Sequence, residues 1–398
     1  MMCGALLKAH KADVLLFEKN EKLGKKLFIT GKGRGNLTNT ADTEGLLEAV
    51  TTNRKFLYSA FYGFNSGDVM NYFSSIGLKL KTERGGRVFP QSNHAYEITD
   101  CLYGQLKKNH VKIRLNTRVQ KILLQDKKVS GILASDKDKF DCDALVIATG
   151  GLSYPSTGST GDGLRFADRL GHTVVAPKGS LVPFETEEPW CEALSGLTLK
   201  NVTLTAYDHK GKEVYSELGE MLFTHFGVSG PLVLSASAHM TDIRPGRYRL
   251  EIDLKPALDT QTLDKKLLRD FSENINKDLI NSLSALLPSK LIAPFISLTG
   301  IPADKKVNSV TAQERKTMVG YLKHLPLTVR SAAPVSEAII TRGGVNVREL
   351  DPKTMQSKLV PGLYFAGEVI DCDAYTGGFN LQIAFQTANA AALSASGS

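Results

Sequence analysis

The residues best suited to chemistry near the start of the chain are a carboxylate that ends an apolar segment and the glycine-rich loop after it. Residues 14–17 read Val-Leu-Leu-Phe and are followed directly by Glu18. A basic loop with the sequence Gly-Lys-Gly-Arg-Gly-Asn occupies residues 31–36. In a dinucleotide-binding fold, the acidic residue that closes the second strand accepts hydrogen bonds from the adenosine ribose. Glu18 at the end of a predicted strand therefore indicates a dinucleotide ligand.

Three further glycine-containing segments could contact the same extended ligand. Residues 149–151 follow an apolar run that is typical of a buried parallel strand, and residues 367–371 follow another short strand. Residues 377–382 begin the final predicted helix. In open α/β sheets, ligands bind beyond the carboxyl ends of the strands, where glycine lets the backbone touch a flat ligand. One such turn is usually structural, but all four together with Glu18 indicate a cofactor site.

The start of the final helix has a specific electrostatic property. Residues 377–382 read Gly-Gly-Phe-Asn-Leu-Gln, and the free N–H groups and the dipole of a helix start favour negative charge. A reduced flavin is anionic near its N1–C2=O edge, so a helix start directed there would favour reduction. An ordinary helix cap by Asn380 would explain the same residues without any cofactor.

The elements that must position these segments predict an α/β fold with two domains. A helix at residues 3–10 precedes the strand that ends at Glu18, which is a Rossmann-like order without its first strand and phosphate loop. From residue 181 to 327, short alternating strands are followed by helical periodicity. We therefore predict a discontinuous dinucleotide-binding domain, residues 1–180 and 328–398, with an inserted β plus helical domain at residues 181–327.

Length and composition narrow the class of protein. A chain of 398 residues with 42% hydrophobic and 23% charged residues is typical of a soluble globular protein with two packed units. The five cysteines are widely spaced and include no Cys-x-x-Cys pair. We therefore expect neither a dithiol centre nor a metal site, and we expect a cytoplasmic location.

Charge and hydropathy give expectations about partners. The net charge of +8 suits anionic small molecules or nucleic acid. The basic residues are scattered, however, and no aromatic residues accompany a basic stripe, so no nucleic-acid partner is expected. We also expect no signal peptide, and the uncharged windows at residues 221–240 and 374–398 are too polar to span a membrane.

These motifs together resemble the HI0933-like group of two-dinucleotide-domain flavoproteins, and the resemblance covers essentially the whole chain. That group includes bile-acid 3-dehydro-delta-4,6-reductases and aminoacetone oxidases. The matching segments are residues 18–26, 31–39, 86–90, 148–155, 222–231, 341–345, 355–358, 367–371 and 377–382.

The resemblance implies that FAD is the cofactor and that residues at the strand ends and glycine turns hold it. Glu18 would bind the adenosine ribose, and Val119 would meet the adenine through its backbone. Loop 31–36 and the final helix start would line the flavin, while the other turns would pass beside the pyrophosphate and ribityl chain. The implied FAD-binding residues are Glu18, Gly33, Arg34, Asn36, Val119, Thr149, Gly150, Gly151, Gly367, Glu368, Asp371, Gly378, Asn380, Leu381 and Gln382.

One departure from the family concerns the beginning of the chain. The family carries a first strand and a glycine-rich phosphate loop before the first helix, and their backbone N–H groups neutralise the pyrophosphate. Here Met1 and Met2 lie within the first predicted helix. We expect this to be a start-site artefact, in which an internal methionine is taken as the start.

The residues that act on the substrate are less strongly indicated than those for FAD. Flavin N5 gives or takes the hydride, so the protein needs to supply only position, polarity and an optional acid. Tyr154 and His225 are the candidate catalytic residues, and Arg87 and Arg342 are candidate anchors for a carboxylate. The structural alternatives are a buried tyrosine with a satisfied hydroxyl, a core histidine and loop-anchoring arginines.

Three functions follow from this resemblance. The first is a FAD-dependent reductase, driven by NADH or NADPH, that reduces a conjugated carbon–carbon double bond in a steroid-like enone such as a 3-oxo-delta-4,6 bile acid. The second is an oxidase of small amines or amino acids that makes hydrogen peroxide. The third is a degenerate, non-catalytic flavoprotein fold. Both enzyme hypotheses predict a small-molecule substrate.

Overall fold

The computed structural model describes residues 1–9 and 12–397, which divide into two compact units. The first unit comprises Met1–Ser180 and Pro334–Ser398, and the second comprises Leu181–Ala333. The second unit ends at Ala333, beyond the predicted boundary at 327. The reason is that strand β16 (Leu325–Ala332) pairs with two strands of the second unit and therefore belongs to it.

Two short parallel strand pairs carry the segments of interest in the first unit. Strand β1 (Leu15–Phe17) pairs with β5 (Lys112–Arg114), and β9 (Leu145–Ile147) pairs with β18 (Leu363–Phe365). Each pair joins segments that are far apart in the sequence, as crossover connections between parallel strands require. The expected α/β class is confirmed by these parallel pairs and the helices packed beside them.

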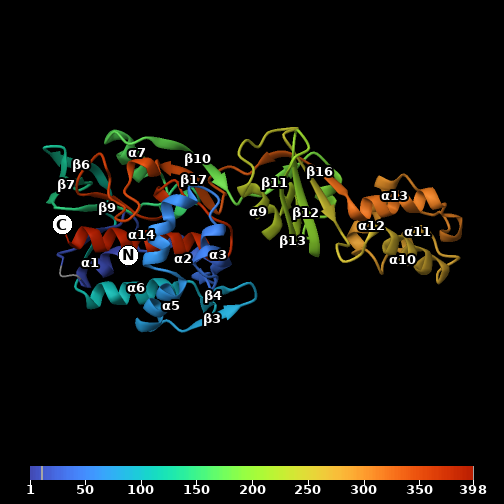
Figure 1. The fold of residues 1–398 in the computed structure, drawn as a ribbon, viewed down its shortest axis with the longest axis horizontal. Helices are drawn as coiled ribbons and strands as arrows, with labels where there is room; N and C mark the ends of the chain where they lie inside the picture. Colours follow the sequence, from blue (N-terminus) through green and yellow to red (C-terminus); the bar gives the residue numbers. More distant parts are fainter. Residues whose placement is uncertain (10–11, 398) are drawn as a thin grey trace. The chain divides into compact units, whose positions relative to one another are not determined.

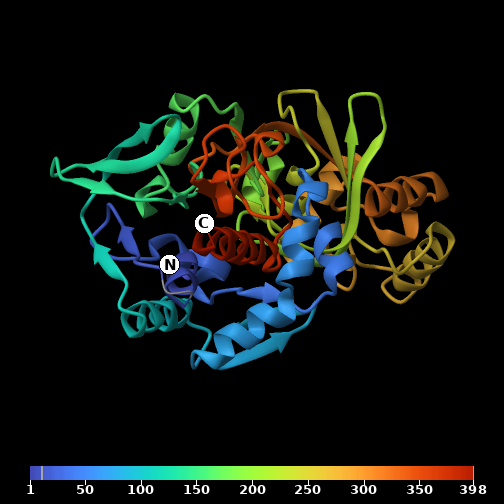
Figure 2. The same ribbon diagram turned by 60° about the vertical axis from the view of Figure 1, so that its left-hand side comes forward.

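The final helix, α14 (Phe379–Ser396), packs against elements from both ends of the first unit. Its neighbours include α1 (Met2–Ala9), α4 (Tyr58–Gly63) and β18. Figures 1 and 2 show α14 in red beside the blue N-terminal helices. The predicted helix at residues 3–10 corresponds to α1, although its last predicted residue, His10, lies outside the described residues.

A large apolar core lies in the first unit beneath these elements. Phe61, Phe73, Phe365 and Leu37 are fully buried in it, and burial of such side chains is the main favourable contribution to folding. The remaining elements that surround this core are α2 (Lys25–Ile29), α3 (Thr43–Glu48), α5 (Ser66–Ser75), α6 (Tyr96–Lys108), α7 (Asp162–Arg169) and the antiparallel pair β10 (Val174–Ser180) and β17 (Ile340–Val345).

Two small antiparallel sheets complete the first unit, each with three strands. One has the order β2–β4–β3 and the other has the order β6–β7–β8. Their bounds are Thr38–Asn39, Arg87–Pro90 and Leu80–Glu83 for the first sheet and Val119–Gln125, Lys128–Ala134 and Lys139–Asp141 for the second. The first sheet positions the residues that follow the basic loop at 31–36.

The second unit is built around a closed antiparallel barrel, which Figure 1 shows together with the helices that lie between its strands in the sequence. Buried and exposed residues alternate along β12, as expected for a strand with one face in a core. The barrel order is β11 (Phe184–Thr186), β14 (Gly227–Ser229), β13 (Glu213–Thr224), β12 (Thr198–Asp208), β15 (Tyr248–Asp253) and β16. The helices are α8 (Trp190–Ala193), α9 (Pro231–Ala238), α10 (Thr260–Ser272), α11 (Leu279–Ser282), α12 (Ser289–Thr299) and α13 (Ala312–Lys323).

Within residues 1–9 and 12–397, no helix has both the length and the apolar character needed to cross a membrane. The same part of the chain contains no group of three His, Cys, Asp or Glu residues that could hold a metal ion. The five cysteines are free thiols.

Candidate functional site

Glu18 lies directly after β1, where its backbone is held by the neighbouring segment. Its N–H donates to the Arg114 carbonyl oxygen at 2.9 Å, and its own carbonyl oxygen accepts from Thr117 N–H at 3.0 Å. One carboxylate oxygen accepts from Asn20 N–H at 2.9 Å. Among the described residues, no donor bonds the second oxygen. The half-buried carboxylate is therefore held at a strand end with one acceptor oxygen available for a ribose hydroxyl.

A charged cluster beside Glu18 fastens three segments together. Asp162, at the start of α7, accepts from Lys19 Nζ at 2.9 Å and from Arg118 Nη2 at 2.5 Å, and it also pairs with Arg165. Burial raises the pKa of the Asp162 carboxyl, but the bonds from Arg118 and Lys19 outweigh it and lower that pKa to about 2. Val119, the first residue of β6, follows Arg118 directly and is half-buried beside this cluster.

The basic loop at residues 31–36 has open space beside one of its glycines, Gly33. Gly31 and Gly33 have φ values of 57° and 83°, and the Gly33 carbonyl oxygen accepts from Ala95 N–H at 2.8 Å. A Cβ built on Gly33 would have no closer neighbour than the Phe28 carbonyl oxygen at 4.0 Å. The positive φ and the open space at Gly33 are what a loop against a flat ligand requires.

Arg34 and Asn36, the polar residues of this loop, are both fixed by neighbouring strands and turns. Arg34 donates through Nε to Asn93 Oδ1 at 3.0 Å, pairs with Glu83 and lies over the Phe89 ring at 4.2 Å. The Asn36 amide, oriented to satisfy its neighbours, accepts from Gly378 N–H at 3.1 Å. Asn36 thus ties the loop to the start of α14, while Arg34 is directed toward β3 and β4.

The start of α14 is shaped by two residues with different functions. Gly378 has φ 100°, and a Cβ there would collide with the Thr38 carbonyl oxygen. The Asn380 side chain accepts from Ala374 N–H at 2.9 Å and donates to the Ala374 carbonyl oxygen at 2.8 Å, so it closes the preceding loop. The first-turn N–H groups of a helix have no partner within the helix. At Asn380 and Leu381, they form a positive end beside the basic loop.

Gln382 differs from the other residues expected at the helix start because its side chain points into the core. It is fully buried, accepts from Thr38 Oγ1 at 2.6 Å and donates to the Phe64 carbonyl oxygen at 3.2 Å. These bonds indicate that the Gln382 side chain positions α14 and does not face a ligand.

The turns after β9 and β18 lie side by side because the two strands are paired. Thr149 Oγ1 accepts from Gly163 N–H at 3.1 Å, which anchors the first turn to α7. Gly150 and Gly367 have φ values of 73° and 75°. A Cβ on Gly151 would collide with the Thr341 hydroxyl, so this turn requires glycine for packing within the chain.

Glu368, an expected FAD-binding residue, lies at the centre of a polar cluster with three partners that are not among the expected site residues. Its carboxylate accepts from Lys26 Nζ, from Ser153 Oγ at 3.0 Å and from Thr341 N–H at 2.9 Å. Lys26 Nζ also donates to Ser153 Oγ at 2.6 Å. All three partners lie in the family-matching segments 18–26, 148–155 and 341–345, so the motifs themselves indicate these residues.

Asp371 and Asp373 form a second polar cluster just after this turn. Asp371 Oδ2 accepts from Asn53 Nδ2 at 2.9 Å, and burial followed by the charge of Asp373 raises the pKa of the Asp371 carboxyl. The fully buried Asp373 pairs with Arg342 at 3.2 Å and accepts from Ser180 Oγ at 2.7 Å. Arg342 therefore neutralises a buried carboxylate of the chain itself, which agrees with the loop-anchoring alternative.

The candidate catalytic residues lie in different units. Tyr154 is half-buried in the first unit, has φ 51°, and donates its N–H to the Ser336 carbonyl oxygen at 3.0 Å. His225 lies in the second unit, exposed in the turn between β13 and β14, with its ring against Phe226. The core-histidine alternative is wrong, because β13 ends at Thr224 and His225 is exposed in the turn that follows. Arg87 is exposed on β4.

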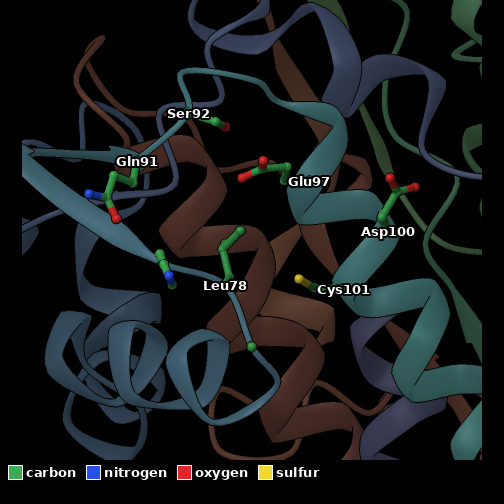
Figure 3. A pocket seen from close by; sticks show the side chains of 8 residues that line it. Leu78, Gln91, Ser92, Glu97, Asp100 and Cys101 are labelled. Carbon is green, nitrogen blue, oxygen red and sulfur yellow. The ribbon is translucent and has the colours of Figure 1, made fainter.

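The residues present fit FAD. Glu18 offers an acceptor at a strand end, Gly33 leaves open space beside its backbone, and the start of α14 supplies positive potential for an anionic ring edge. A separate cavity of about 380 Å³ lies near the start of α6, with Leu78, Gln91, Glu97 and Asp100 around it (Figure 3). None of the expected FAD-binding residues lines that cavity.

Comparison with known proteins assigns the family. Residues 1–394 match the family described as "HI0933-like protein Rossmann domain". The chain belongs to this family. Membership confirms the resemblance drawn from the motifs and the expected Rossmann-type fold, and it supports FAD as the cofactor.

Three family relatives match this chain over nearly all of their length. The "Ribosomal RNA dihydrouridine synthase" of Haemophilus influenzae is 32% identical over 100% of this chain and 96% of its own. The protein of the same name from Escherichia coli is 31% identical over 98% and 94%. The "3-dehydro-bile acid delta(4,6)-reductase" of Clostridium scindens is 29% identical over 94% and 91%.

Solved structures with the same fold are more distant in sequence. A 3-ketosteroid-delta4-(5alpha)-dehydrogenase from Rhodococcus jostii RHA1 has a TM-score of 0.53 at 14% identity, covering 99% of this chain and 94% of that one. The open conformation of a flavocytochrome c3 fumarate reductase has a TM-score of 0.51 at 17% identity, covering 100% and 76%. This likeness concerns the fold alone.

Proposed function

We propose that this family member is a FAD-dependent reductase that adds hydrogen across a carbon–carbon double bond conjugated with a carbonyl group. The names of the relatives support one reaction class. Dihydrouridine is uridine saturated at C5–C6, beside the C4 carbonyl, and the delta(4,6) designation likewise marks carbon–carbon double bonds. Both reactions place a hydride on one alkene carbon and a proton on the other.

The proposal rests mainly on the contact between loop 31–36 and the start of α14. Bound FAD would supply the hydride, which is the cofactor's own chemistry. The contribution of the chain is positional: Asn36 holds Gly378 N–H, and the first-turn N–H groups of α14 stabilise negative charge that develops beside them. Gly33 leaves room for a flat ring against the loop backbone.

Tyr154 is the proposed source of the proton. It follows the glycine turn at 149–151, and its left-handed backbone at φ 51° is a conformation that non-glycine residues adopt rarely. Such conformations cost free energy and concentrate at functional sites. A tyrosine hydroxyl could donate to the substrate while the substrate accepts a hydride on its other alkene carbon.

The first candidate substrate is a uracil base in ribosomal RNA. The two relatives with that activity in their names have the higher identities, 32% and 31%, over almost the whole chain. The net charge of +8 also favours an anionic polymer. These observations weigh against the expectation that no nucleic acid takes part. The second candidate is the steroid-like enone, supported by the relative at 29% identity.

NADH or NADPH is the proposed electron donor, and one experiment tests donor and substrate together. The purified protein would be reduced anaerobically with each nucleotide while its flavin absorbance is followed. Reduced protein would then be mixed with unmodified ribosomal RNA, with free uridine or with a 3-oxo-delta-4,6 steroid. Flavin reoxidation with a product heavier by two hydrogens identifies the substrate by mass spectrometry. Reoxidation by oxygen alone would contradict the reductase proposal.

A further inference from the structure

The net positive charge of this protein comes entirely from one of its two units. Residues 181–333 contain eighteen Lys and Arg and eighteen Asp and Glu, so the second unit is neutral overall. The whole net charge of +8 therefore belongs to the first unit, which carries the expected FAD-binding residues. An anionic partner would be attracted to that unit rather than to the barrel.

Four cations of the first unit lie on the basic loop and on the β3–β4 hairpin, and we call them the basic rim. Lys32 and Arg34 belong to the loop, Arg84 occupies the hairpin turn, and Arg87 begins β4. Lys32, Arg84 and Arg87 are exposed, and the Arg34 side chain is 37% exposed.

Backbone hydrogen bonds connect the two parts of the rim directly. Leu37 N–H donates to the Val88 carbonyl oxygen at 2.8 Å, and Thr40 N–H donates to the Gly86 carbonyl oxygen at 2.7 Å. Asn39 Nδ2 then bridges the hairpin turn at the Gly85 carbonyl oxygen, 2.9 Å away, and the Gly377 carbonyl oxygen, 3.2 Å away. The rim is therefore built on the same backbone that holds the start of α14.

One acidic side chain within the rim is already neutralised. Glu83 pairs with Arg34 and lies 3.5 Å from Lys81 Nζ, so its charge is balanced by the hairpin and the loop. Arg87 Nε donates to the Arg84 carbonyl oxygen at 3.2 Å, which orients its guanidinium without removing its charge. Lys32, Arg84 and Arg87 thus remain as cations without a salt-bridge partner among the described residues.

We propose that the basic rim binds the backbone phosphates of the RNA strand that carries the target uracil. This inference rests on the proposed function and names the contact that would position its substrate. A base that reacts inside a protein site must leave its stack, and contacts to flanking phosphates hold the strand while it does so. Arginine suits this role because its planar guanidinium can bond two phosphate oxygens.

Binding of a fluorescent 20-nucleotide single-stranded RNA, followed by anisotropy at several salt concentrations, tests the rim. The test variant is the double substitution Arg84→Gln and Arg87→Gln. The matched control is Lys121→Gln with Lys139→Gln, which removes two exposed cations from the β6–β7–β8 sheet. Loss of two phosphate contacts should weaken binding about tenfold at low salt and reduce the slope of log K against log salt by about 1.4. The control should bind like the unaltered protein.

Three outcomes would contradict the proposal that the basic rim binds RNA phosphates. One is unchanged RNA binding by the test variant, and another is an equal loss in the control, which would indicate only overall charge. The third is a raised KM for NADPH with unchanged RNA binding, which would assign the rim to a nucleotide phosphate. Flavin absorbance and melting temperature check that each variant is folded.

The test is separate from that of the reductase reaction because binding is measured without turnover. If the protein reduces an enone but binds no RNA, the proposed role of the basic rim is wrong and the proposed reaction class still holds. If the rim binds RNA but the protein reduces no double bond, the proposed reaction is wrong and the proposed role of the basic rim still holds.

Discussion

Lys26 and Glu368 form an ion pair across most of the length of the sequence, and Ser153 bonds both side chains. The Lys26 ammonium donates to Ser153 Oγ at 2.6 Å, and Ser153 Oγ lies 3.0 Å from Glu368 Oε1. Helix α2 is thereby joined at one point to two segments that are expected to surround FAD, the turn after β9 and the turn after β18. Their relative positions depend on this polar cluster as well as on the apolar core.

Lys26→Met should destabilise the protein because it leaves the Glu368 carboxylate, which is only 12% exposed, without its cation. Methionine and lysine have similar helix propensities, so α2 itself should be little affected. Since both partners keep some solvent contact, we expect a loss of about 1–3 kcal/mol in the free energy of unfolding. Urea denaturation at neutral pH measures it.

Lys25→Met is the matched control in the same helix. Lys25 pairs with Glu21, whose side chain is 60% exposed, and such surface pairs contribute about 0.5 kcal/mol or less. Equal losses for the two variants would show that the Lys26–Glu368 pair has no special importance for stability.

Gly378→Ala should disrupt the start of α14 for two reasons. The residue has φ 100°, and an added Cβ would collide with the Thr38 carbonyl oxygen. We expect a loss of more than about 2 kcal/mol in unfolding free energy together with loss of bound flavin. Denaturant titration and the flavin absorbance of the purified variant measure the two effects.

Two glycine variants separate the causes of that loss. Gly77→Ala has the same positive φ but open space around its Cβ, so it should cost about 1 kcal/mol and keep the flavin. Gly104→Ala lies within α6 with ordinary φ and open space, and it should stabilise by about 0.5–1 kcal/mol. A Gly378→Ala loss no larger than that of Gly77→Ala would contradict the predicted collision.

The stability contributions of Asp162 and Asp371 should change with pH in opposite directions. The folded-state pKa of Asp162 is lowered from 3.8 to about 2, so its contribution is present above pH 3.8 and is lost as pH falls toward 2. The pKa of Asp371 is raised, so its contribution is present below pH 3.8 and is lost as pH rises through the folded-state value.

Unfolding free energies of Asp162→Asn and Asp371→Asn, measured against the unaltered protein between pH 2 and 7, check this prediction. Because Arg118 and Arg165 are half exposed, we expect Asp162→Asn to cost about 1–2 kcal/mol at neutral pH. That cost should shrink toward pH 2, whereas the cost of Asp371→Asn should be greatest at low pH. Parallel profiles for the two variants would show that their neighbours do not set these pKa values.

Tyr154→Phe should slow substrate reduction while leaving flavin reduction by the nicotinamide nucleotide unchanged. A positioned proton donor contributes about 100-fold or more to such a step, and phenylalanine keeps the ring and the backbone conformation. Stopped-flow absorbance of the flavin measures the two half-reactions separately. Tyr103→Phe, on the exposed face of α6, is the control. A similar decrease in both half-reactions, or a large fall in melting temperature, would assign Tyr154 a structural role instead.

The sequence by itself determined the class of the protein and the places where its backbone must be glycine. Glu18 after an apolar run, loop 31–36 and the turns at Gly150, Gly367 and Gly378 are local features. Their φ values follow from residue type over a few positions, and the structure places them at strand ends and at a helix start as expected.

Tertiary structure alone decided how the polar side chains are used. Arg34 turns to Glu83, Gln382 is buried against Thr38, and Arg342 neutralises Asp373, because each partner comes from a segment far away in the sequence. His225 became exposed because β13 ends one residue before it. Strand register and packing set such partnerships, and neither can be read from the spacing of residues along the chain.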